Sequence, residues 1–158
     1  MSNFQIRKAT PEDTPTIFNL IYKLAVYEKL ENDVITTVEE LRTNIFEKNY
    51  AEVLIAEENE KPIGFALYFH NFSTFVGKPG IYLEDLFVEP EMRGKGYGKA
   101  LLVELSKIAK ERNCGRLEWS VLDWNTPSIE FYKSLGAKPM DEWTVFRLNK
   151  EGIENLAK

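Results

Sequence analysis

Apolar and polar residues alternate along the chain in patterns that predict short strands and amphipathic helices. From Ile17 to Ala25 the apolar residues recur at the spacing of one helix face. Turn-forming residues precede this stripe, so a helix is predicted over residues 10–30. A short strand is predicted over residues 3–9 and a second, shorter helix over residues 36–46.

The rest of the chain alternates between strand and helix patterns. Residues 51–72 have the pattern of two antiparallel strands joined by a charged turn. Further strands are predicted over residues 80–88, 115–124 and 142–149, further helices over residues 98–113 and 126–136, and a fraying or docking tail over residues 151–158. The helix over residues 126–136 has Thr126 as its N-cap, Pro127 in its first turn and Gly136 at its end. This order predicts a partly parallel sheet covered by helices, in one mixed α/β domain that spans residues 1–158.

Composition, charge and cysteine content narrow the class of protein. The chain is 44% apolar, 13% aromatic and 28% charged, which is typical of a globular domain. Its net charge of −5 argues against nucleic acid as a partner and suits a small cationic molecule. The single cysteine, Cys114, excludes an internal disulfide and fits a reducing cytoplasm. No apolar run approaches the about 18 residues of a membrane span and no signal-peptide core is present, so we expect a cytoplasmic protein with no membrane partner.

A glycine-rich segment, RGKGYG at residues 93–98, connects a predicted strand to a predicted helix. Its glycines allow a ligand to approach the backbone closely, and the first N–H groups of a helix have no partner within it. Together with the positive end of the helix dipole and the side chains of Arg93, Lys95 and Lys99, these groups suit a pyrophosphate. The simpler alternative is a tight turn with a basic rim.

Three nucleotide-binding motifs can be compared with this loop. A P-loop requires a glycine where this chain has Glu89, so a P-loop is excluded. A dinucleotide-binding loop requires G-x-G-x-x-G, whereas this loop is G-x-G-x-G, and the acidic residue about 20 positions further on, Glu118, lies within a predicted strand. The motif R-x-x-G-x-G, the pyrophosphate cradle of acetyl-coenzyme A-dependent N-acetyltransferases, is matched by Arg93, Gly96 and Gly98. The third motif fits best.

Two adjacent carboxyl groups, Glu84 and Asp85, interrupt the otherwise apolar strand IYLEDLFV. We expect this strand to be covered on both faces, with the two side chains pointing to opposite faces. An unpaired buried carboxylate is costly, so each needs a partner or a function. If the cofactor is acetyl-coenzyme A, a partly desolvated carboxylate with a raised pKa can take a proton from an acceptor ammonium. Glu84 is the candidate for this base, and Asp85 is expected to hold a cationic group or to brace the opposite layer.

The helix predicted over residues 126–136 carries a candidate general acid. Ser128 and Tyr132 are four residues apart and share one helix face, from which the Tyr132 hydroxyl could reach the thioester sulfur. A general acid there would protonate the thiolate that acetyl transfer produces. Ordinary amphipathic packing is the alternative interpretation for this tyrosine. Asn125 precedes the helix, where it could cap the first turn, hydrogen-bond the pantetheine amides, or do both.

With these motifs in place, the chain resembles the GCN5-related N-acetyltransferase (GNAT) superfamily, and more closely the diamine (spermidine/spermine) and thialysine acetyltransferases. The resemblance runs nearly end to end and rests on three blocks, IRKATPEDTPTIFNLIYKLAVYEKLEN, IYLEDLFVEPEMRGKGYGKALL and VLDWNTPSIEFYKSLGA. It implies a single-domain α/β GNAT fold, in which helices cover both faces of a mixed central sheet and splayed parallel strands leave a gap for pantetheine. It also implies a homodimer whose subunits complete each other's acceptor site.

The resemblance and the loop motif together assign roles to individual residues. They imply Tyr132 as general acid and Glu84 at the acceptor amine. Contacts to acetyl-coenzyme A are implied for Leu86, Phe87, Val88, Arg93, Gly94, Lys95, Gly96, Tyr97, Gly98, Lys99, Asn125, Ser128, Phe131 and Tyr132. The residues implied at the acceptor site are Tyr27, Glu28, Glu84, Asp85, Glu118, Trp119 and Ser120.

One departure concerns the acceptor. Where the polyamine branch has an acidic residue and a tryptophan before its Gly-Lys turn, this chain has Ser73 and Phe75, so a partner for a distal ammonium is lost. The sequence therefore favours a lysine-like amine or a small diamine, acetylated directly in a ternary complex. A coenzyme A-binding sensor without catalysis is the alternative, and a dinucleotide-dependent oxidoreductase is a third. His70, the only histidine, is expected in a surface or satisfied polar position, and no metal is expected.

Overall fold

The computed structural model describes residues 3–158, which form two compact units. The first unit ends at Ser120 and contains the sheet, and the second begins at Val121. That the whole chain folds as one domain, as the sequence predicts, stays a prediction.

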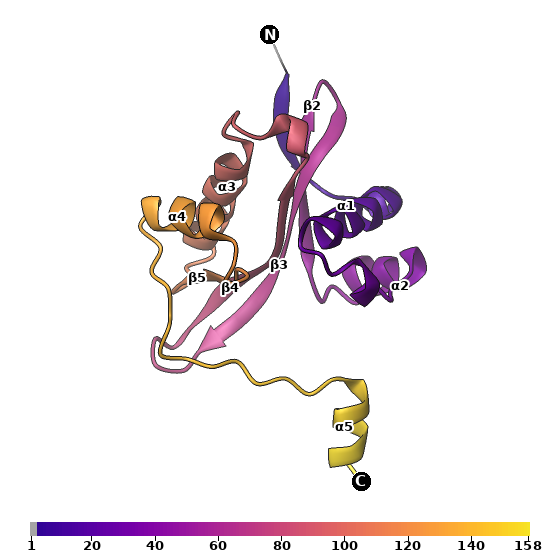
Figure 1. Ribbon diagram of the computed structural model, residues 1–158, viewed down its shortest axis with the longest axis vertical. Helices are drawn as coiled ribbons and strands as arrows, with labels where there is room; N and C mark the ends of the chain where they lie inside the picture. The colour runs from indigo at the N-terminus through magenta and orange to yellow at the C-terminus, as the bar shows by residue number, and fades with distance from the viewer. Residues whose placement is uncertain (1–2) are drawn as a thin grey trace. The chain divides into compact units, whose positions relative to one another are not determined.

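A five-stranded sheet forms the centre of the first unit (Figure 1). Its strands, in their order across the sheet, are β1 (Phe4–Lys8), β2 (Glu52–Glu58), β3 (Lys61–Ser73), β4 (Lys78–Val88) and β5 (Leu117–Trp119). The first four strands pair antiparallel with their neighbours, and β4 pairs parallel with β5. Asn59 and Glu60 have positive φ values of 54° and 67°, which suit the two-residue turn between β2 and β3. The predicted mixed sheet is confirmed.

Helices cover both faces of this sheet. α1 (Thr14–Tyr27) and α2 (Val38–Arg42) lie on one face, and α3 (Tyr97–Glu111) lies on the other (Figure 1). The shorter turns are three 3-10 turns at Pro11–Asp13, Glu31–Asp33 and Pro90–Met92, and a π-helical turn at Thr43–Glu47. Asp13 accepts two hydrogen bonds from Arg7, each of 2.8 Å, which tie the start of α1 to β1. The predicted positions of these three helices are confirmed to within a few residues at their ends.

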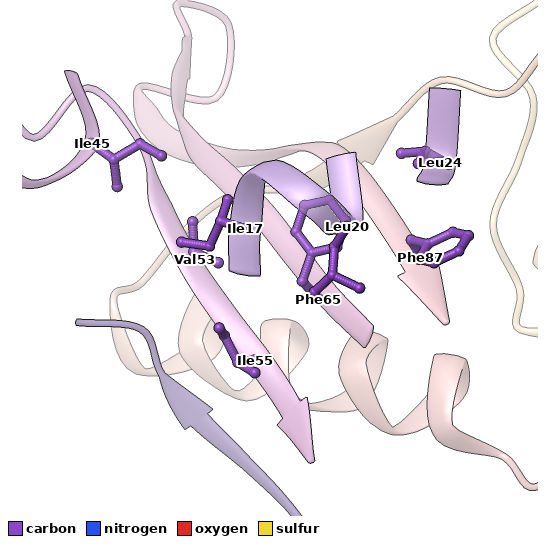
Figure 2. Close-up of a cluster of buried hydrophobic side chains, with 8 residues drawn as sticks. All are labelled: Ile17, Leu20, Leu24, Ile45, Val53, Ile55, Phe65 and Phe87. Atoms are coloured by element: carbon purple, nitrogen blue, oxygen red, sulfur yellow. The ribbon is translucent and has the colours of Figure 1, made fainter. Parts of the chain in front are cut away.

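The main hydrophobic core lies between the sheet and the helices α1 and α2. Figure 2 shows its eight buried side chains, Ile17, Leu20, Leu24, Ile45, Val53, Ile55, Phe65 and Phe87. Ile17, Ile55 and Phe65 have no exposed surface. A fully buried side chain of this size contributes roughly 1.5–3 kcal/mol. The helical spacing that predicts α1 therefore identifies the face that packs on the sheet.

A β-bulge at Glu84 interrupts the alternation of β4. Leu83 pairs with Tyr68 and Asp85 pairs with Leu67, so Glu84 has no partner on β3. Tyr68 and Leu67 are neighbours on β3 and point to opposite faces of the sheet. Leu83 and Asp85 therefore also face opposite sides, although they are two residues apart. The bulge places Asp85 on the α1 face, where Leu67 packs against the core.

The second unit contains two helices, α4 (Thr126–Ser134) and α5 (Lys150–Leu156). Asn125, rather than the predicted Thr126, is the N-cap residue of α4, because the Asn125 side chain accepts a hydrogen bond from the Ser128 N–H. Gly136 follows the helix with a φ of 93°, so the predicted helix end is confirmed.

Two predicted strands differ from the structure. The strand expected over residues 115–124 is limited to β5, because only these three residues pair with β4. The strand expected over residues 142–149 is wrong, since this segment contains no strand. Its alternating pattern is present, but a strand requires a partner, and no other strand lies in the second unit's residues 121–158. Four of its large apolar side chains, Trp143, Val145, Phe146 and Leu148, are exposed.

Candidate active site

The glycine-rich loop adopts a backbone conformation that leaves the start of α3 uncapped. Gly94 and Gly96 have φ values of 84° and 83°, in the left-handed region that glycine favours. Gly96 is the N-cap residue of α3, and no side chain caps the helix there. The N–H groups of the first turn therefore suit an anionic ligand, which the positive end of the helix dipole also attracts.

Two side chains anchor this loop to the sheet. The Tyr97 hydroxyl donates a hydrogen bond to the Glu58 carboxylate at the end of β2, and this bond lowers the pKa of Glu58. The Tyr97 ring stacks on the Phe4 ring with centroids 4.0 Å apart. Lys95 Nζ lies 3.4 Å from the same Glu58 carboxylate. Of the predicted loop cations, Lys95 is thus paired within the protein, whereas Lys99 is exposed and makes no ion pair with a described residue.

Arg93 connects the loop to the end of α1. Its Nε donates a hydrogen bond of 3.0 Å to the Val88 carbonyl. Its guanidinium lies over the Tyr27 ring, 4.6 Å from the centroid, and 5.6 Å from the Phe87 centroid. Contacts of this kind contribute about 0.5–2 kcal/mol. A residue predicted on the cofactor side, Arg93, therefore touches one predicted on the acceptor side, Tyr27.

Three carboxyl groups interact electrostatically: Glu28, which follows Tyr27, and Glu84 and Asp85 on β4. The pKa of Glu28 is raised by burial first and by the charge of Glu84 second. The pKa of Asp85 is raised to about 7 by burial first, and then by the charges of Glu84 and Glu28. Glu84 is exposed, whereas Glu28 and Asp85 are half-buried. These three predicted acceptor residues form one electrostatically coupled group.

One expectation about the carboxyl pair is corrected. Glu84 is not covered on both faces of the sheet, because the bulge removes it from the ladder and exposes it. That Glu84 and Asp85 point to opposite faces stays a prediction. The raised pKa that the sequence analysis expects of a buried carboxylate is found at Asp85.

The parallel pairing of β4 and β5 is short, because β5 ends at Trp119. They pair from Ile81 with Leu117 to Leu83 with Trp119, and the pairing stops there. Residues 84–88 of β4 therefore have no strand partner on their β5 side within the first unit. This segment contains Leu86, Phe87 and Val88, for which cofactor contacts are predicted. The predicted mixed sheet contains one parallel pair, and a pantetheine gap between splayed strands stays a prediction.

The predicted acceptor residues on and after β5 have partners of their own. The Glu118 carboxylate accepts a hydrogen bond of 3.2 Å from Asn71 and pairs with Arg116 Nε at 3.2 Å. Ser120 Oγ lies 2.6 Å from the Tyr82 hydroxyl. Trp119 is half-buried. Glu118 is thus committed to contacts within the first unit, and its place in an acceptor channel stays a prediction.

The remaining predicted residues lie in the second unit. The Asn125 side chain lies 3.4 Å from the Ser128 nitrogen in the cap of α4, so both residues shape the helix start. The rings of Phe131 and Tyr132 are neighbours, with centroids 5.7 Å apart, and Tyr132 is half-buried. The approach of these α4 residues to the glycine loop stays a prediction.

Comparison with known proteins identifies the family. A model of the acetyltransferase (GNAT) family matches residues 16–137. The chain belongs to this family. This GNAT acetyltransferase is 37% identical to thialysine N-epsilon-acetyltransferase of Bos taurus over 169 aligned residues, which cover 99% of each chain. The predicted resemblance is confirmed.

Two further similar proteins extend the comparison. L-ornithine N5-acetyltransferase NATA1 of Arabidopsis thaliana is 30% identical to this GNAT acetyltransferase, with 98% of this chain and 88% of that one covered. An integron cassette protein from the mobile metagenome of V. cholerae has a similar solved structure, with a TM-score of 0.82, 30% identity and 98% of both chains covered. The predicted GNAT fold is confirmed.

The loop of this acetyltransferase fits acetyl-coenzyme A, the co-substrate of the GNAT family. Its helix start is uncapped, as a pyrophosphate requires. A Cβ added at Gly94 or Gly96 would meet no atom within 4 Å, so the space beside the backbone is open. Lys99, in the first turn of α3, adds a positive charge.

Some contacts of the site are missing from the sequence prediction. Phe4 and Glu58 hold Tyr97 in place, and Lys23 on α1 pairs at 2.5 Å with Glu89, which directly follows β4. Lys23 and Glu89 are 66 positions apart, and no local pattern links residues at such a separation. The sequence gave no sign of this ion pair, because lysines and glutamates are common on the surface of globular domains.

Other features of the described residues concern membranes, metals and the single histidine. No helix in residues 3–158 is long and apolar enough to cross a membrane. Within the same residues, no group of three or more His, Cys, Asp or Glu side chains could hold a metal ion. His70 has its Nδ1 3.0 Å from the Gly80 carbonyl oxygen and its Nε2 3.0 Å from Arg112. The predicted satisfied polar position of His70 is confirmed.

Proposed function

We propose that this protein transfers the acetyl group of acetyl-coenzyme A to a primary amine of a small cationic acceptor. The acceptor is a thialysine-like or lysine-like amine, or a small diamine or polyamine. The observation that carries the proposal is an uncapped, glycine-rich helix start whose Arg93 contacts Tyr27, next in the chain to Glu28 of the acidic group Glu28, Glu84 and Asp85. A cationic acceptor suits the negatively charged carboxyl groups, and an anionic donor suits the positive end of the helix dipole at the start of α3.

On the donor side, the backbone between Gly94 and Lys99 holds the pyrophosphate, and the unpaired edge at residues 86–88 contacts the pantetheine arm. When bound, acetyl-coenzyme A supplies an acetyl thioester that an amine can attack. Arg93 acts indirectly, by holding Tyr27 and the end of β4 in place. Further donor contacts, proposed from the family resemblance, come from Asn125, Ser128, Phe131 and Tyr132.

The reaction requires a base and an acid. An amine with a pKa near about 10 is an ammonium ion at neutral pH, and only its free base attacks a carbonyl. Glu84, exposed at the bulge, accepts this proton directly or through a water molecule. The Tyr132 hydroxyl donates a proton to the departing sulfur. Transfer is direct in a ternary complex, without a covalent enzyme intermediate.

The turn before β4 favours a lysine-like acceptor. Ser73 is buried, and its Oγ accepts a hydrogen bond of 3.2 Å from the Val76 N–H, so it stabilises the turn. Phe75 is fully exposed. Neither residue supplies a negative charge for the distal ammonium of spermidine or spermine. Two of the similar proteins are named for thialysine and L-ornithine, which supports the same class of acceptor.

We further propose that the protein is a homodimer. The segment of residues 142–149 has a strand pattern and exposes four large apolar side chains. A second copy of the chain would supply the strand partner that this segment lacks in its own unit. The resemblance further implies that the two subunits complete each other's acceptor sites.

An amine panel tests the enzymatic proposal. The protein is mixed with acetyl-coenzyme A and with thialysine, L-lysine, L-ornithine, 1,3-diaminopropane, spermidine or spermine, and free thiol is followed against a control without amine. We expect thiol release above hydrolysis, fastest with the lysine-like amines. If no amine gives release while coenzyme A binds tightly, the sensor alternative replaces the enzyme. Thermal stabilisation by NAD instead of coenzyme A would favour the oxidoreductase alternative, since stabilisation follows RT ln(1 + [L]/Kd).

A further inference from the structure

The side chain of Tyr97 fixes the first turn of α3 to the sheet. No described side chain caps the helix at Gly96, so its first N–H groups stay available to a ligand. Tyr97, the first residue of α3, is buried against two directly opposed residues of the sheet, Phe4 on β1 and Glu58 on β2. A helix start that must leave its N–H groups free for an anion needs another anchor than a cap, and Tyr97 is that anchor.

Glu58, at the end of β2, contacts two residues of the glycine-rich segment. Its Oε2 accepts the hydrogen bond of the Tyr97 hydroxyl, and Lys95 Nζ lies 3.4 Å from the same oxygen. The side chain of Glu58 is only 11% exposed, whereas that of Lys95 is 47% exposed. An ion pair with so exposed a partner is weak. The carboxylate is therefore the fixed member of the pair, and the lysine is the member that can leave.

The other contacts of Lys95 keep it on the same side of the loop. Its Nζ lies 3.6 Å from Met92 Sδ and 5.9 Å from the centroid of the Tyr97 ring. Arg93 instead places its guanidinium over an aromatic ring of α1, and Lys99 is exposed and makes no ion pair with a described residue. Among these three basic side chains, Lys95 is thus the one that a protein carboxylate holds, and a phosphate could take the place of that carboxylate.

We propose that Glu58 is a positioning residue of the coenzyme A site. It fixes the start of α3 through Tyr97, and it holds Lys95 until the pyrophosphate of the cofactor takes over this lysine. A pyrophosphate has more negative charge and more acceptor oxygens than one carboxylate, so it is the stronger partner for an ammonium group. After the exchange Glu58 keeps the hydrogen bond from Tyr97. The inference rests on the proposed function only in taking the loop as the coenzyme A site.

The two contacts of Glu58 have opposite effects on cofactor affinity. The hydrogen bond from Tyr97 favours binding, because it holds the helix start in place before the ligand arrives. The pair with Lys95 opposes binding, because it must break first. Glu58→Gln separates the two contacts, since the glutamine carbonyl oxygen still accepts from Tyr97 but lacks the charge that holds Lys95. Tyr97→Phe removes the hydroxyl and keeps the ring that stacks on Phe4.

Calorimetric titration of coenzyme A, without amine, tests both contacts. Tyr97→Phe should weaken binding about threefold to tenfold, as expected from one lost hydrogen bond. Glu58→Gln should tighten binding about twofold to fivefold at about 50 mM salt, and the gain should shrink at about 500 mM salt, where charges are screened. In a Lys95→Met background, Glu58→Gln should no longer change the affinity, because it acts through Lys95. Glu60→Gln neutralises a neighbouring exposed glutamate and should bind as the wild type.

Steady-state kinetics separate positioning from a general loss of structure. Tyr97→Phe should raise KM for acetyl-coenzyme A in proportion to the loss of affinity, and leave kcat and the KM of the amine within about twofold. Unchanged coenzyme A affinity in Tyr97→Phe or in Glu58→Gln would overturn the inference, as would a gain from Glu58→Gln that persists in the Lys95→Met background.

The same measurements distinguish this inference from the proposed function. If coenzyme A binds with the expected changes but no amine is acetylated, the enzymatic proposal fails and the role of Glu58 stands. If the wild type acetylates an amine while both variants bind coenzyme A as the wild type does, the role of Glu58 fails and the enzymatic proposal stands. A wild type that does not bind coenzyme A would overturn both.

Discussion

At the residue scale, Asp85 should make folding stability fall as pH rises. Its pKa in the folded protein, about 7, lies above its ordinary value of 3.8, so the folded state binds this proton more tightly than the unfolded chain does. The contribution of Asp85 is therefore most favourable below pH 3.8, declines up to about pH 7, and is constant above. A shift of this size corresponds to on the order of 4 kcal/mol.

Urea unfolding at pH 5 and pH 8 measures this contribution. Asp85→Asn removes the titration, so we expect the variant to gain roughly 2–3 kcal/mol relative to the wild type between these two pH values. Asp13→Asn is a matched control of opposite sign. Hydrogen bonding from Arg7 lowers the pKa of Asp13 to about 2, so this carboxylate stabilises the folded state at both pH values. A gain for Asp85→Asn that is the same at both pH values would contradict a raised pKa.

Tyr132 is the residue on which the acid step of the proposed reaction depends. Without its hydroxyl, the departing thiolate must leave unprotonated, so Tyr132→Phe should lower kcat by more than about tenfold, since a general acid typically contributes 10²–10⁴. Coenzyme A binding, measured by calorimetry, should change by less than about twofold, because the ring remains. Tyr50→Phe, at an exposed tyrosine, should leave kcat unchanged. Full turnover by Tyr132→Phe would remove this residue from the mechanism.

Glu84 belongs to the base step, and its test is the pH–rate profile. Glu84→Gln cannot accept a proton, so the reaction should depend on amine that is already neutral, and the profile should move towards higher pH. Glu154→Gln, an exposed change in the second unit, should leave the profile in place. A profile that does not move for Glu84→Gln would exclude Glu84 as the base.

At the scale of the element, two glycines at the start of α3 are expected to have different roles. Gly98 leaves room for a ligand, whereas Gly96 provides a backbone conformation that alanine does not readily adopt. Gly98 is helical, and an added Cβ would meet only Val88 Cγ2, at 4.0 Å. Gly98→Ala should therefore keep or raise stability by up to about 1 kcal/mol, while the methyl group obstructs the cofactor and raises KM for acetyl-coenzyme A. Gly96→Ala should instead lose about 1–2 kcal/mol, because its φ of 83° is strained for alanine.

Thermal unfolding and steady-state kinetics on both variants measure these two effects. An unchanged KM in Gly98→Ala would mean that the cofactor does not approach the backbone at this position, and would favour the simple-turn interpretation of the loop. The comparison is informative because Gly96 and Gly98 are two residues apart in the same loop, so a general disturbance of the loop should affect both variants alike.

Elements were predictable from sequence where local spacing determines them. The helical stripe of α1 and the apolar runs of β2 and β3 follow from which residues are buried in the fold, so these elements lie close to their predicted positions. The bulge at Glu84 was not predictable, because it depends on the register of β4 against β3. The strand expected over residues 142–149 failed for a related reason, since an alternating pattern supplies only one of the two partners of a ladder.

At the scale of the whole molecule, the exposed C-terminal segment predicts self-association. Phe146→Asp places a charge among the apolar side chains at residues 143–148, so we expect it to convert a dimer into a monomer and to lower activity, if subunits complete each other's sites. Ile35→Asp is the matched control, because Ile35 is 89% exposed and Phe146 is 92% exposed. Sedimentation velocity should show dimers for the wild type and for Ile35→Asp. A wild-type protein that stays monomeric at all concentrations would contradict the homodimer.

The sequence by itself determined the order of elements, the glycine loop that starts α3, and the residues that could carry acetyl transfer, because these depend on spacing within short segments. Only the tertiary structure decided how those residues act on one another. The β-bulge put Asp85 on the same face of the sheet as Leu67, and burial, followed by the charges of Glu84 and Glu28, raised its pKa. The tertiary structure also placed the Arg93 guanidinium over the Tyr27 ring, with its Nε donating a hydrogen bond to the Val88 carbonyl. Such effects arise between residues far apart in the chain, where charge and burial depend on which surfaces meet.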